Sequence, residues 1–160
     1  MNEVYEFLKQ CGVYYLATVE GDQPHVRPFG TIDQYEGKLY IQTGRKKPVA
    51  AQLKANPKVE LSGMAAGRWI RITAEAVLDE NIAAQEHMLA AYPSLQGMYK
   101  PGDGNTEVYW LKNATAQICS FTEPAKSSSS LLSLKMVRQM AANSSSSAVW
   151  IADTVPYDFS

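Results

Sequence analysis

The sequence predicts a mainly β protein of the α+β class, built as a small antiparallel barrel with flanking helices. Strand-like runs outnumber helix-like runs, and tight turns join most consecutive strands, so we expect these strands to pair antiparallel. A doubly wound parallel sheet would need a crossover helix between consecutive strands, and the sequence lacks that alternation. The 160 residues, 46% of them apolar, suffice for one globular domain with a small appendage.

The first half of the chain begins with a helix and continues as strands joined by short turns. Val4, Phe7, Leu8 and Cys11 share one face at helical spacing, and Gly12 ends the helix. Three extended runs rich in β-branched and aromatic residues follow: 13–19, 24–35 and 38–43. Two prolines in the second run favour an edge strand or a bulge there.

The second half mixes helices with strands. A proline at position 48 suits the first turn of a helix, and Asp79 is a candidate cap for a later one. The expected elements are a helix over 48–55, strands over 58–64 and 68–78, a helix over 79–92, and final strands over 106–112 and 115–121.

The last part of the chain differs in composition from the rest. Runs of four serines at 127–130 and 144–147 are typical of flexible linkers. We therefore expect a folded domain over 1–123. A serine-rich tail over 124–160 would be partly disordered or contain a short docking helix, with no chemistry of its own.

Charge and cysteine content exclude several functional classes. The net charge of −1 provides no global field for nucleic acid or anionic lipid, so a nucleic-acid site at "GRKK" is disfavoured. No apolar run is long enough for a membrane span, and the N-terminus does not resemble a secretory signal. Cys11 and Cys119 form no CxxC pair, so no metal site is expected and both are interpreted as buried free thiols. We expect a cytoplasmic protein.

The stretch "TGRKKP" (43–48) is a candidate phosphate site. A phosphate favours a helix N-terminus, a hydroxyl and cations. Thr43 supplies the hydroxyl, and Arg45, Lys46 and Lys47 supply the charge. The same residues could instead form a solvated basic turn. The phosphate-loop pattern GxxxxGK[ST] and the dinucleotide pattern GxGxxG are both absent.

Two further stretches, "HVRPF" and "RWIR", combine cations with rings. Arg27 and Phe29 project from one face of an extended segment, on either side of Pro28. Trp69 and Arg71 point away from the isoleucines that alternate with them. With the candidate phosphate site, they fit a ligand with a planar head and a phosphate tail, such as flavin mononucleotide (FMN) or another phosphorylated ring.

Ordered motifs over residues 1–123 resemble a known family. "FLKQCGVYYLATVEGDQPHVRPFG", "LYIQTGRKK", "QLKANPKVELSG" and "WIRITAEA" are similar to the pyridoxamine 5'-phosphate oxidase-like split-barrel flavoproteins, and most of all to their NimC/NimA (nitroimidazole-resistance) branch. The resemblance implies a six-stranded split barrel and a homodimer with FMN at its interface. The residues it assigns to the cofactor are Arg27, Pro28 and Phe29 along the flavin ring, Thr43, Arg45, Lys46 and Lys47 at the phosphate, and Trp69 and Arg71 from a neighbouring strand.

The resemblance also limits the activity expected. Trp69 stands where the classical oxidases have Gln, and their C-terminal substrate-binding pattern is absent, so we do not expect pyridoxamine-phosphate oxidation. The expected function is FMN-dependent oxidoreduction of a small planar substrate, such as a nitroaromatic. The alternative is a non-catalytic flavin- or haem-binding module that carries electrons or acts as a sensor. No catalytic residue is assigned, although His25 is the one nearby group whose ordinary pKa suits proton exchange near neutrality.

Overall fold

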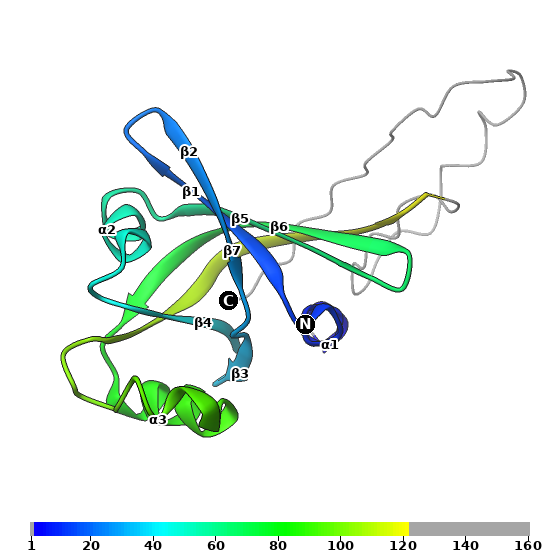
Figure 1. The fold of residues 1–160 in the computed structure, drawn as a ribbon. Coiled ribbons are helices and arrows are strands. Elements are labelled where there is room, and N and C mark those ends of the chain that lie inside the picture. The colour runs from blue at the N-terminus through cyan, green and yellow to red at the C-terminus, as the bar shows by residue number, and fades with distance from the viewer. Residues whose placement is uncertain (1, 122–160) are drawn as a thin grey trace, which may run out of the picture.

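The structure is a computed structural model that describes residues 2–121, so the predicted tail lies outside the described residues. Its elements, in chain order, are α1 (Asn2–Cys11), β1 (Tyr14–Glu20), β2 (Gln23–Phe29), β3 (Asp33–Tyr35), β4 (Lys38–Gly44), α2 (Pro48–Ala55), β5 (Lys58–Ala65), β6 (Arg68–Asp79), α3 (Ile82–Ala91), a 3-10 turn η1 (Pro93–Leu95) and β7 (Thr106–Ser120). Figure 1 shows the strands curving around a common interior.

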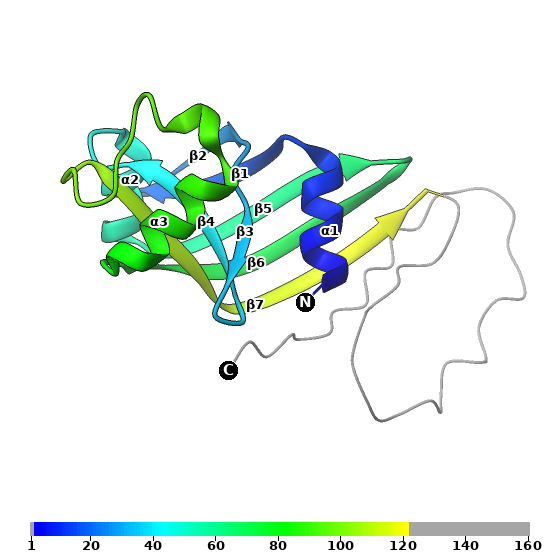
Figure 2. The same ribbon diagram turned by 90° about the horizontal axis from the view of Figure 1, so that it is seen from below.

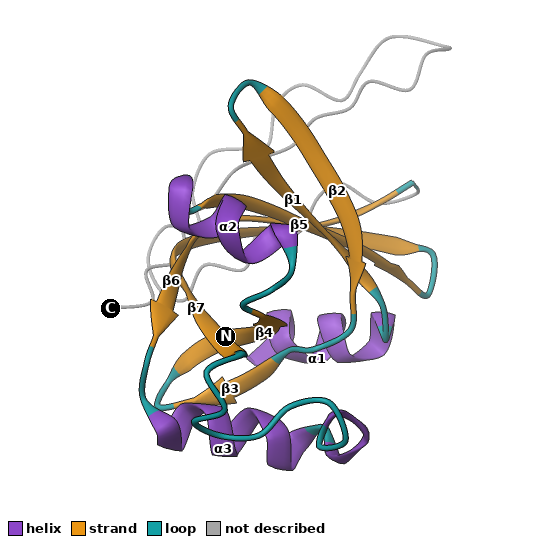
Figure 3. Ribbon diagram, turned by 60° about the vertical axis from the view of Figure 1, so that its left-hand side comes forward, coloured by secondary structure: helices purple, strands orange, loops and turns teal. Residues whose placement is uncertain are grey.

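The strands form one antiparallel sheet in the order β2-β1-β5-β6-β7-β4-β3. Tight turns join β1 to β2, β3 to β4 and β5 to β6, as the sequence predicted. Long strands β6 and β7 run side by side through the middle of the sheet, as Figure 2 shows. Because β1 and β4 lie far apart in the sheet order, α2 can pack against both and close the interior between them (Figure 3).

One hydrophobic core fills the inner face of the curved sheet. It takes side chains from α1, α2 and five strands, including the fully buried Leu16, Ile41, Leu61, Ile70 and Ile72. A smaller cluster around Tyr40 and Met88 packs α3 onto the other side of β4 and β7. The two faces of β4 are therefore both covered, which explains why the strand is buried along almost its whole length.

The sheet has seven strands, so the expected count of six was wrong. The segment expected as one strand over 24–35 is divided into β2 and β3. Between them, the backbone of Ile32 bonds to the Tyr92 side chain, whose hydroxyl accepts from Ile32 N at 2.8 Å and donates to Ile32 O at 2.7 Å. The Thr31 hydroxyl likewise bonds to the Gln42 backbone. Side chains distant in sequence thus replace strand partners at this break.

The two strands expected at the end of the chain are a single strand, β7. Asn113 has a positive φ of 52°, and the pairing register with β6 shifts between Thr73 and Glu75. This irregularity is a bulge-like defect in the ladder, which bends a strand without ending it. The sequence around Asn113 resembles a turn, but β7 pairs with β6 on both sides of Asn113 and therefore continues as one strand.

The predicted helices are present with small changes at their ends. Gly12, with φ of 67°, ends α1 as expected. Asn81, rather than Asp79, caps α3, because its side chain accepts from Ala83 N at 3.0 Å. Asp79 instead ends β6 and accepts a hydrogen bond from the Tyr40 hydroxyl at 2.8 Å.

Two further expectations concern membrane spans and the burial of the cysteines. Within residues 2–121, no helix is long and apolar enough to cross a membrane. Cys119 is a buried free thiol as expected, while Cys11 is free but only partly buried.

Candidate functional site

The basic turn after β4 is the centre of a charged group that packs beneath and beside α2. Glu107 on β7 lies directly opposite Thr43 on β4, so their side chains share the inner face of the sheet. We call this group the α2 cluster, and it consists of Thr43, Arg45, Lys46, Lys47, Lys54 and Glu107.

Thr43 is buried, and its hydroxyl oxygen has no hydrogen-bond partner among the described residues. A buried hydroxyl without a partner is rare in proteins, since leaving one unsatisfied costs roughly 1–3 kcal/mol. The next residues form a turn that enters α2 through Pro48. Lys47 occupies the cap position without a side-chain cap bond. A buried hydroxyl without a partner and three cations in sequence therefore come directly before the N-terminus of α2.

The backbone N–H groups of the turn are already hydrogen bonded within the chain. Arg45 N donates to Asn105 O at 2.7 Å, Lys46 N donates to Asn105 Oδ1 at 3.3 Å, and Lys47 N donates to Gly44 O at 2.9 Å. These bonds anchor the turn to the start of β7. Side chains, rather than these three amides, are therefore the donors available for an anion here.

Glu107 and Lys54 are members of the cluster that sequence reasoning missed. The buried Glu107 carboxylate accepts from Arg45 Nε at 2.8 Å, from Lys54 Nζ at 2.5 Å and from the Tyr109 hydroxyl at 2.7 Å. Burial alone would raise the pKa of Glu107, but the bonds from Lys54, Tyr109 and Arg45 outweigh it and hold this pKa below its ordinary value. Lys54 lies two helical turns after Lys47, so both lysines are on the same side of α2. This spacing is the sequence feature that could have placed Lys54 near the basic turn.

Arg27 is held on the other flank of α2. Its guanidinium donates to Leu16 O at 3.1 Å, to the Thr18 hydroxyl at 2.6 Å and to Gln52 Oε1 at 2.7 Å. Gln52 also donates to Glu20 at 2.8 Å. Partial burial lowers the pKa of Arg27 from its ordinary value, and the guanidinium remains charged because that value is high. Arg27 therefore joins β2 to α2, the helix that carries the cations.

The neighbours of Arg27 point to opposite sides of β2. Phe29 shares the inner side with Arg27 and packs against Tyr14, with ring centroids 6.1 Å apart. Pro28 is exposed on the outer side, opposite Tyr15 of β1. The predicted ring-lining stretch is thus divided between two faces of the sheet.

Trp69 and Arg71 lie on the outer face, while Ile70 and Ile72 are buried in the core, as their alternation predicted. Arg71 forms an ion pair with Glu60 at 2.9 Å. Within one chain, the sheet therefore separates these two residues from the α2 cluster, and the structure does not bring all the predicted site residues together.

The outer face that carries Trp69 also exposes large apolar side chains. They come from neighbouring strands and the chain segment after β7, and they are Tyr15, Val26, Met64 and Phe121. The rings of Trp69 and Phe121 lie 4.8 Å apart at the edge of this group. We call Tyr15, Val26, Met64, Trp69 and Phe121 the outer apolar face. Among the described residues, α1 and α2 pack against the opposite, core-facing side of the sheet.

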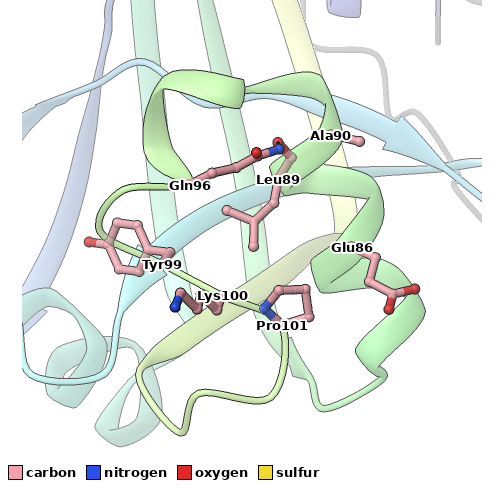
Figure 4. Close-up of a pocket in the computed structure, with 7 residues that line it drawn as sticks. All are labelled: Glu86, Leu89, Ala90, Gln96, Tyr99, Lys100 and Pro101. Atoms are coloured by element: carbon pink, nitrogen blue, oxygen red, sulfur yellow. The ribbon is translucent and has the colours of Figure 1, made fainter.

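A cavity of about 340 Å³ opens beside α3, and none of the predicted site residues lines it (Figure 4). Its lining residues are Glu86, Leu89, Ala90, Gln96, Tyr99, Lys100 and Pro101. The charged side chains there are exposed, and Glu86 and Tyr99 lie at opposite ends of the opening. Tyr99 also approaches the basic turn, because the Lys47 ammonium lies 5.9 Å from its ring centroid. The cavity is therefore a neighbour of the α2 cluster rather than part of it.

His25, the candidate for proton exchange, lies on β2 with its Nε2 atom 3.6 Å from the Glu20 carboxylate. The Glu20 side chain is largely exposed, and the His25 side chain is partly exposed. Among residues 2–121, no group of three or more histidine, cysteine, aspartate or glutamate side chains is arranged to hold a metal ion.

The chain is similar to known proteins in both sequence and fold. The family model for pyridoxamine 5'-phosphate oxidase matches residues 1–120. A NimC/NimA family protein from Clostridium acetobutylicum is 48% identical in sequence, and its crystal structure matches with a TM-score of 0.75 over 78% of this chain and 91% of that one.

More distant structures share the fold alone. General Stress Protein 26 from Bacillus anthracis is 19% identical, with a TM-score of 0.61 over 73% of this chain and 91% of that one. An FAD-binding protein from Mesorhizobium loti is 16% identical, with a TM-score of 0.52 over 74% and 94% of the two chains. No curated protein sequence matches the chain. The family match and the 48% identity show that the chain belongs to the pyridoxamine 5'-phosphate oxidase family, within its NimC/NimA branch.

Proposed function

We propose that the protein binds FMN and acts as an oxidoreductase on a small planar substrate such as a nitroaromatic. The observation that carries the proposal is the α2 cluster. A buried hydroxyl without a partner among the described residues, Thr43 Oγ1, lies on β4 opposite Glu107, which pairs with Arg45 and Lys54, and the basic turn that enters α2 follows directly. This set of donors suits a phosphate monoester.

The residues present fit the phosphate of FMN. Thr43, Arg45, Lys46 and Lys47 would hold it, with Lys54 as an additional cation. Bound FMN would supply the electron-transfer chemistry, while the protein supplies binding and orientation. An FAD-binding protein with the same fold, from Mesorhizobium loti, supports a flavin as the ligand class.

The proposed cofactor site requires a second copy of the chain. Pro28, Trp69 and Arg71 lie on the side of the sheet away from the α2 cluster, so one chain cannot bring every residue of the proposed site to one flavin. We propose a homodimer in which the outer apolar face is covered by the partner and the cofactor lies at the interface. The exposed side chains of Tyr15, Val26 and Met64 support this assembly, because such groups are costly to leave in water.

The phosphate site is tested by removing charge from the turn. Lys46→Ala combined with Lys47→Ala should weaken FMN binding roughly 10- to 100-fold, since each charge-assisted contact contributes about 1.5 kcal/mol or more and 1.4 kcal/mol is tenfold. Titration of apoprotein with FMN, followed by flavin fluorescence, measures the affinity. Circular dichroism checks that the exposed substitutions leave the fold intact.

A matched control removes two lysines from β4 and β7, the strands that flank the turn, at positions far from it. Lys38 begins β4, whereas the turn follows its end, and Lys112 lies five residues beyond Glu107 on β7. Lys38→Ala with Lys112→Ala changes the net charge equally and should leave FMN affinity within about twofold. Equal losses in both double variants would reject a phosphate site at the turn.

Turnover is tested separately from binding. The purified protein is first examined by absorption spectroscopy, and any chromophore is released with acid and identified. Reduction of bound FMN by NADH or NADPH, followed by reoxidation with a nitroaromatic compound, would support the oxidoreductase. Bound flavin that neither pyridine nucleotide reduces would instead indicate a non-catalytic flavin-binding module, and a Soret band would indicate haem.

A further inference from the structure

Glu107 places a buried negative charge inside a group of cations that we propose to bind an anion. By Coulomb's law alone, this carboxylate weakens anion binding, since it repels a phosphate and neutralises part of the attracting charge. Its side chain is nevertheless only 1% exposed. Burying a carboxylate is unfavourable unless it is paired and hydrogen bonded. Glu107 is therefore a buried and paired carboxylate whose charge has the same sign as the anion proposed to bind beside it.

Three donors from three parts of the chain converge on this carboxylate. Arg45 from the turn and Lys54 from α2 both donate to Oε1, and Tyr109 from β7 donates to Oε2. Tyr109 is itself almost fully buried, so its ring fixes the carboxylate in place. Lys54 and Arg45 come from opposite ends of α2 in the sequence, and Glu107 connects them through space.

The way in which Arg45 binds Glu107 leaves most of its donors available. Arg45 uses Nε for Glu107, and among the described residues its two terminal nitrogens donate to no acceptor. A guanidinium has five N–H donors in a rigid plane, so fixing one edge fixes the direction of the others. The Arg45 side chain is half exposed, and the free edge can reach a ligand at the turn.

We infer that Glu107 is a positioning residue that holds Arg45 and Lys54 in place for a phosphate bound at the start of α2. This inference rests on the proposed FMN site and identifies what organises it. Held side chains lose less conformational entropy when an anion binds, and this gain offsets the repulsion from the carboxylate. A carboxylate that only stabilised the fold would have no specific effect on the phosphate of the ligand.

Glu107→Gln separates these roles, because it removes the charge and keeps the shape. Apoprotein is titrated with FMN and with riboflavin, which is the same ring system without the phosphate. We expect wild-type protein to prefer FMN. In E107Q, FMN affinity should fall about tenfold while riboflavin affinity stays unchanged, so the preference for FMN is largely lost. Glu6→Gln on the exposed side of α1 removes the same charge and should leave both affinities unchanged.

Tyr109→Phe is a second variant, and it carries the test if E107Q does not fold. It removes one donor to Glu107 and keeps the buried ring. We expect a smaller loss of FMN affinity, about two- to fivefold, again without a change for riboflavin.

Three results would overturn the inference. Unchanged or tighter FMN binding in E107Q would show that Glu107 acts only through its charge or not at all. Equal losses for FMN and riboflavin would show a structural role alone. Wild-type protein that does not prefer FMN over riboflavin would reject the phosphate site itself, and the inference would fail with it. In the first two cases the wild-type preference remains, so the proposed function survives.

Discussion

The two faces of the sheet differ in which side chains they bury and which they expose. On the inner side, beneath α2, the buried Glu107 carboxylate accepts hydrogen bonds from Arg45, Lys54 and Tyr109. On the outer side, apolar side chains such as Val26 and Met64 are exposed. Ordinary folding would place charge outside and apolar groups inside. The inner side therefore holds a buried charge, whereas the outer side exposes apolar groups.

The two faces also differ in which elements pack against them. The charged groups of the inner face find their partners within the same chain, since α2, the turn after β4, and β7 supply donors and acceptors to one another. The outer apolar face exposes Tyr15, Val26 and Met64 within the described chain, and we propose that a second copy covers it. The comparison can be tested by disturbing each face separately.

The largest expected effect follows from charging the outer apolar face. Val26→Asp with Met64→Asp should convert the proposed dimer to a monomer, with the dimer dissociation constant rising more than 100-fold, because unpaired carboxylates would be buried and repel each other across the interface. Sedimentation velocity measures the change. Each monomer should remain folded, since both positions are exposed within one chain.

Met98→Asp is the control for this variant. Met98 is 67% exposed, like Val26 at 68%, but it lies in the segment after η1 and not on the outer apolar face. This control should stay dimeric. A wild-type protein that sediments as a monomer, or a double variant that remains dimeric, would contradict the assignment of this face.

A moderate effect is expected when one ion-paired side chain is removed from each face. Glu107→Ala should lower the free energy of unfolding by about 1–3 kcal/mol, because it deletes a buried acceptor of three hydrogen bonds. The cost stays below that of a fully buried pair because Arg45 and Lys54 are 53% and 41% exposed and can turn to water. Arg71→Ala on the outer face breaks an exposed pair and should cost at most about 1 kcal/mol. Urea denaturation, carried out in the monomeric Val26→Asp/Met64→Asp background, measures the free energy of unfolding of both variants. Equal losses for Glu107→Ala and Arg71→Ala would contradict the distinction between the faces.

The smallest expected effect is in the pH dependence of stability. Because the pKa of Glu107 is lower in the folded protein than its ordinary value of 4.5, the carboxylate contributes stability above that value and loses it as the pH falls through the folded pKa. Wild-type protein should therefore lose stability more steeply than E107Q below about pH 4.5. Asp103, whose pKa is lowered to about 2 mainly by backbone hydrogen bonds against the effect of burial, adds the same slope to both proteins and cancels in the difference. Parallel curves for the two proteins would contradict a stabilising role for the ionised Glu107.

Local sequence signals predicted what local physics controls. The apolar spacing in α1 and its stop at Gly12, the tight turns between strands, and the basic turn entering α2 were all visible in short stretches. Ordered motifs along residues 1–123 also identified the family, which the comparisons confirmed. The helix and its stop, the tight turns and the basic turn each depend on residues within a few positions of one another, so the sequence by itself determined them.

Only the tertiary structure decided the features that depend on distant residues. Tyr92 divides the segment between β2 and β3 from 60 positions away, and Glu107 reaches Arg45 across 62 positions. The sheet also places Arg27 on one face and Trp69 on the other, which neither stretch reveals alone. The physical reason is that hydrogen bonds and charge pairing act over a few ångströms in space, whatever the separation along the chain, and only the folded chain sets those distances.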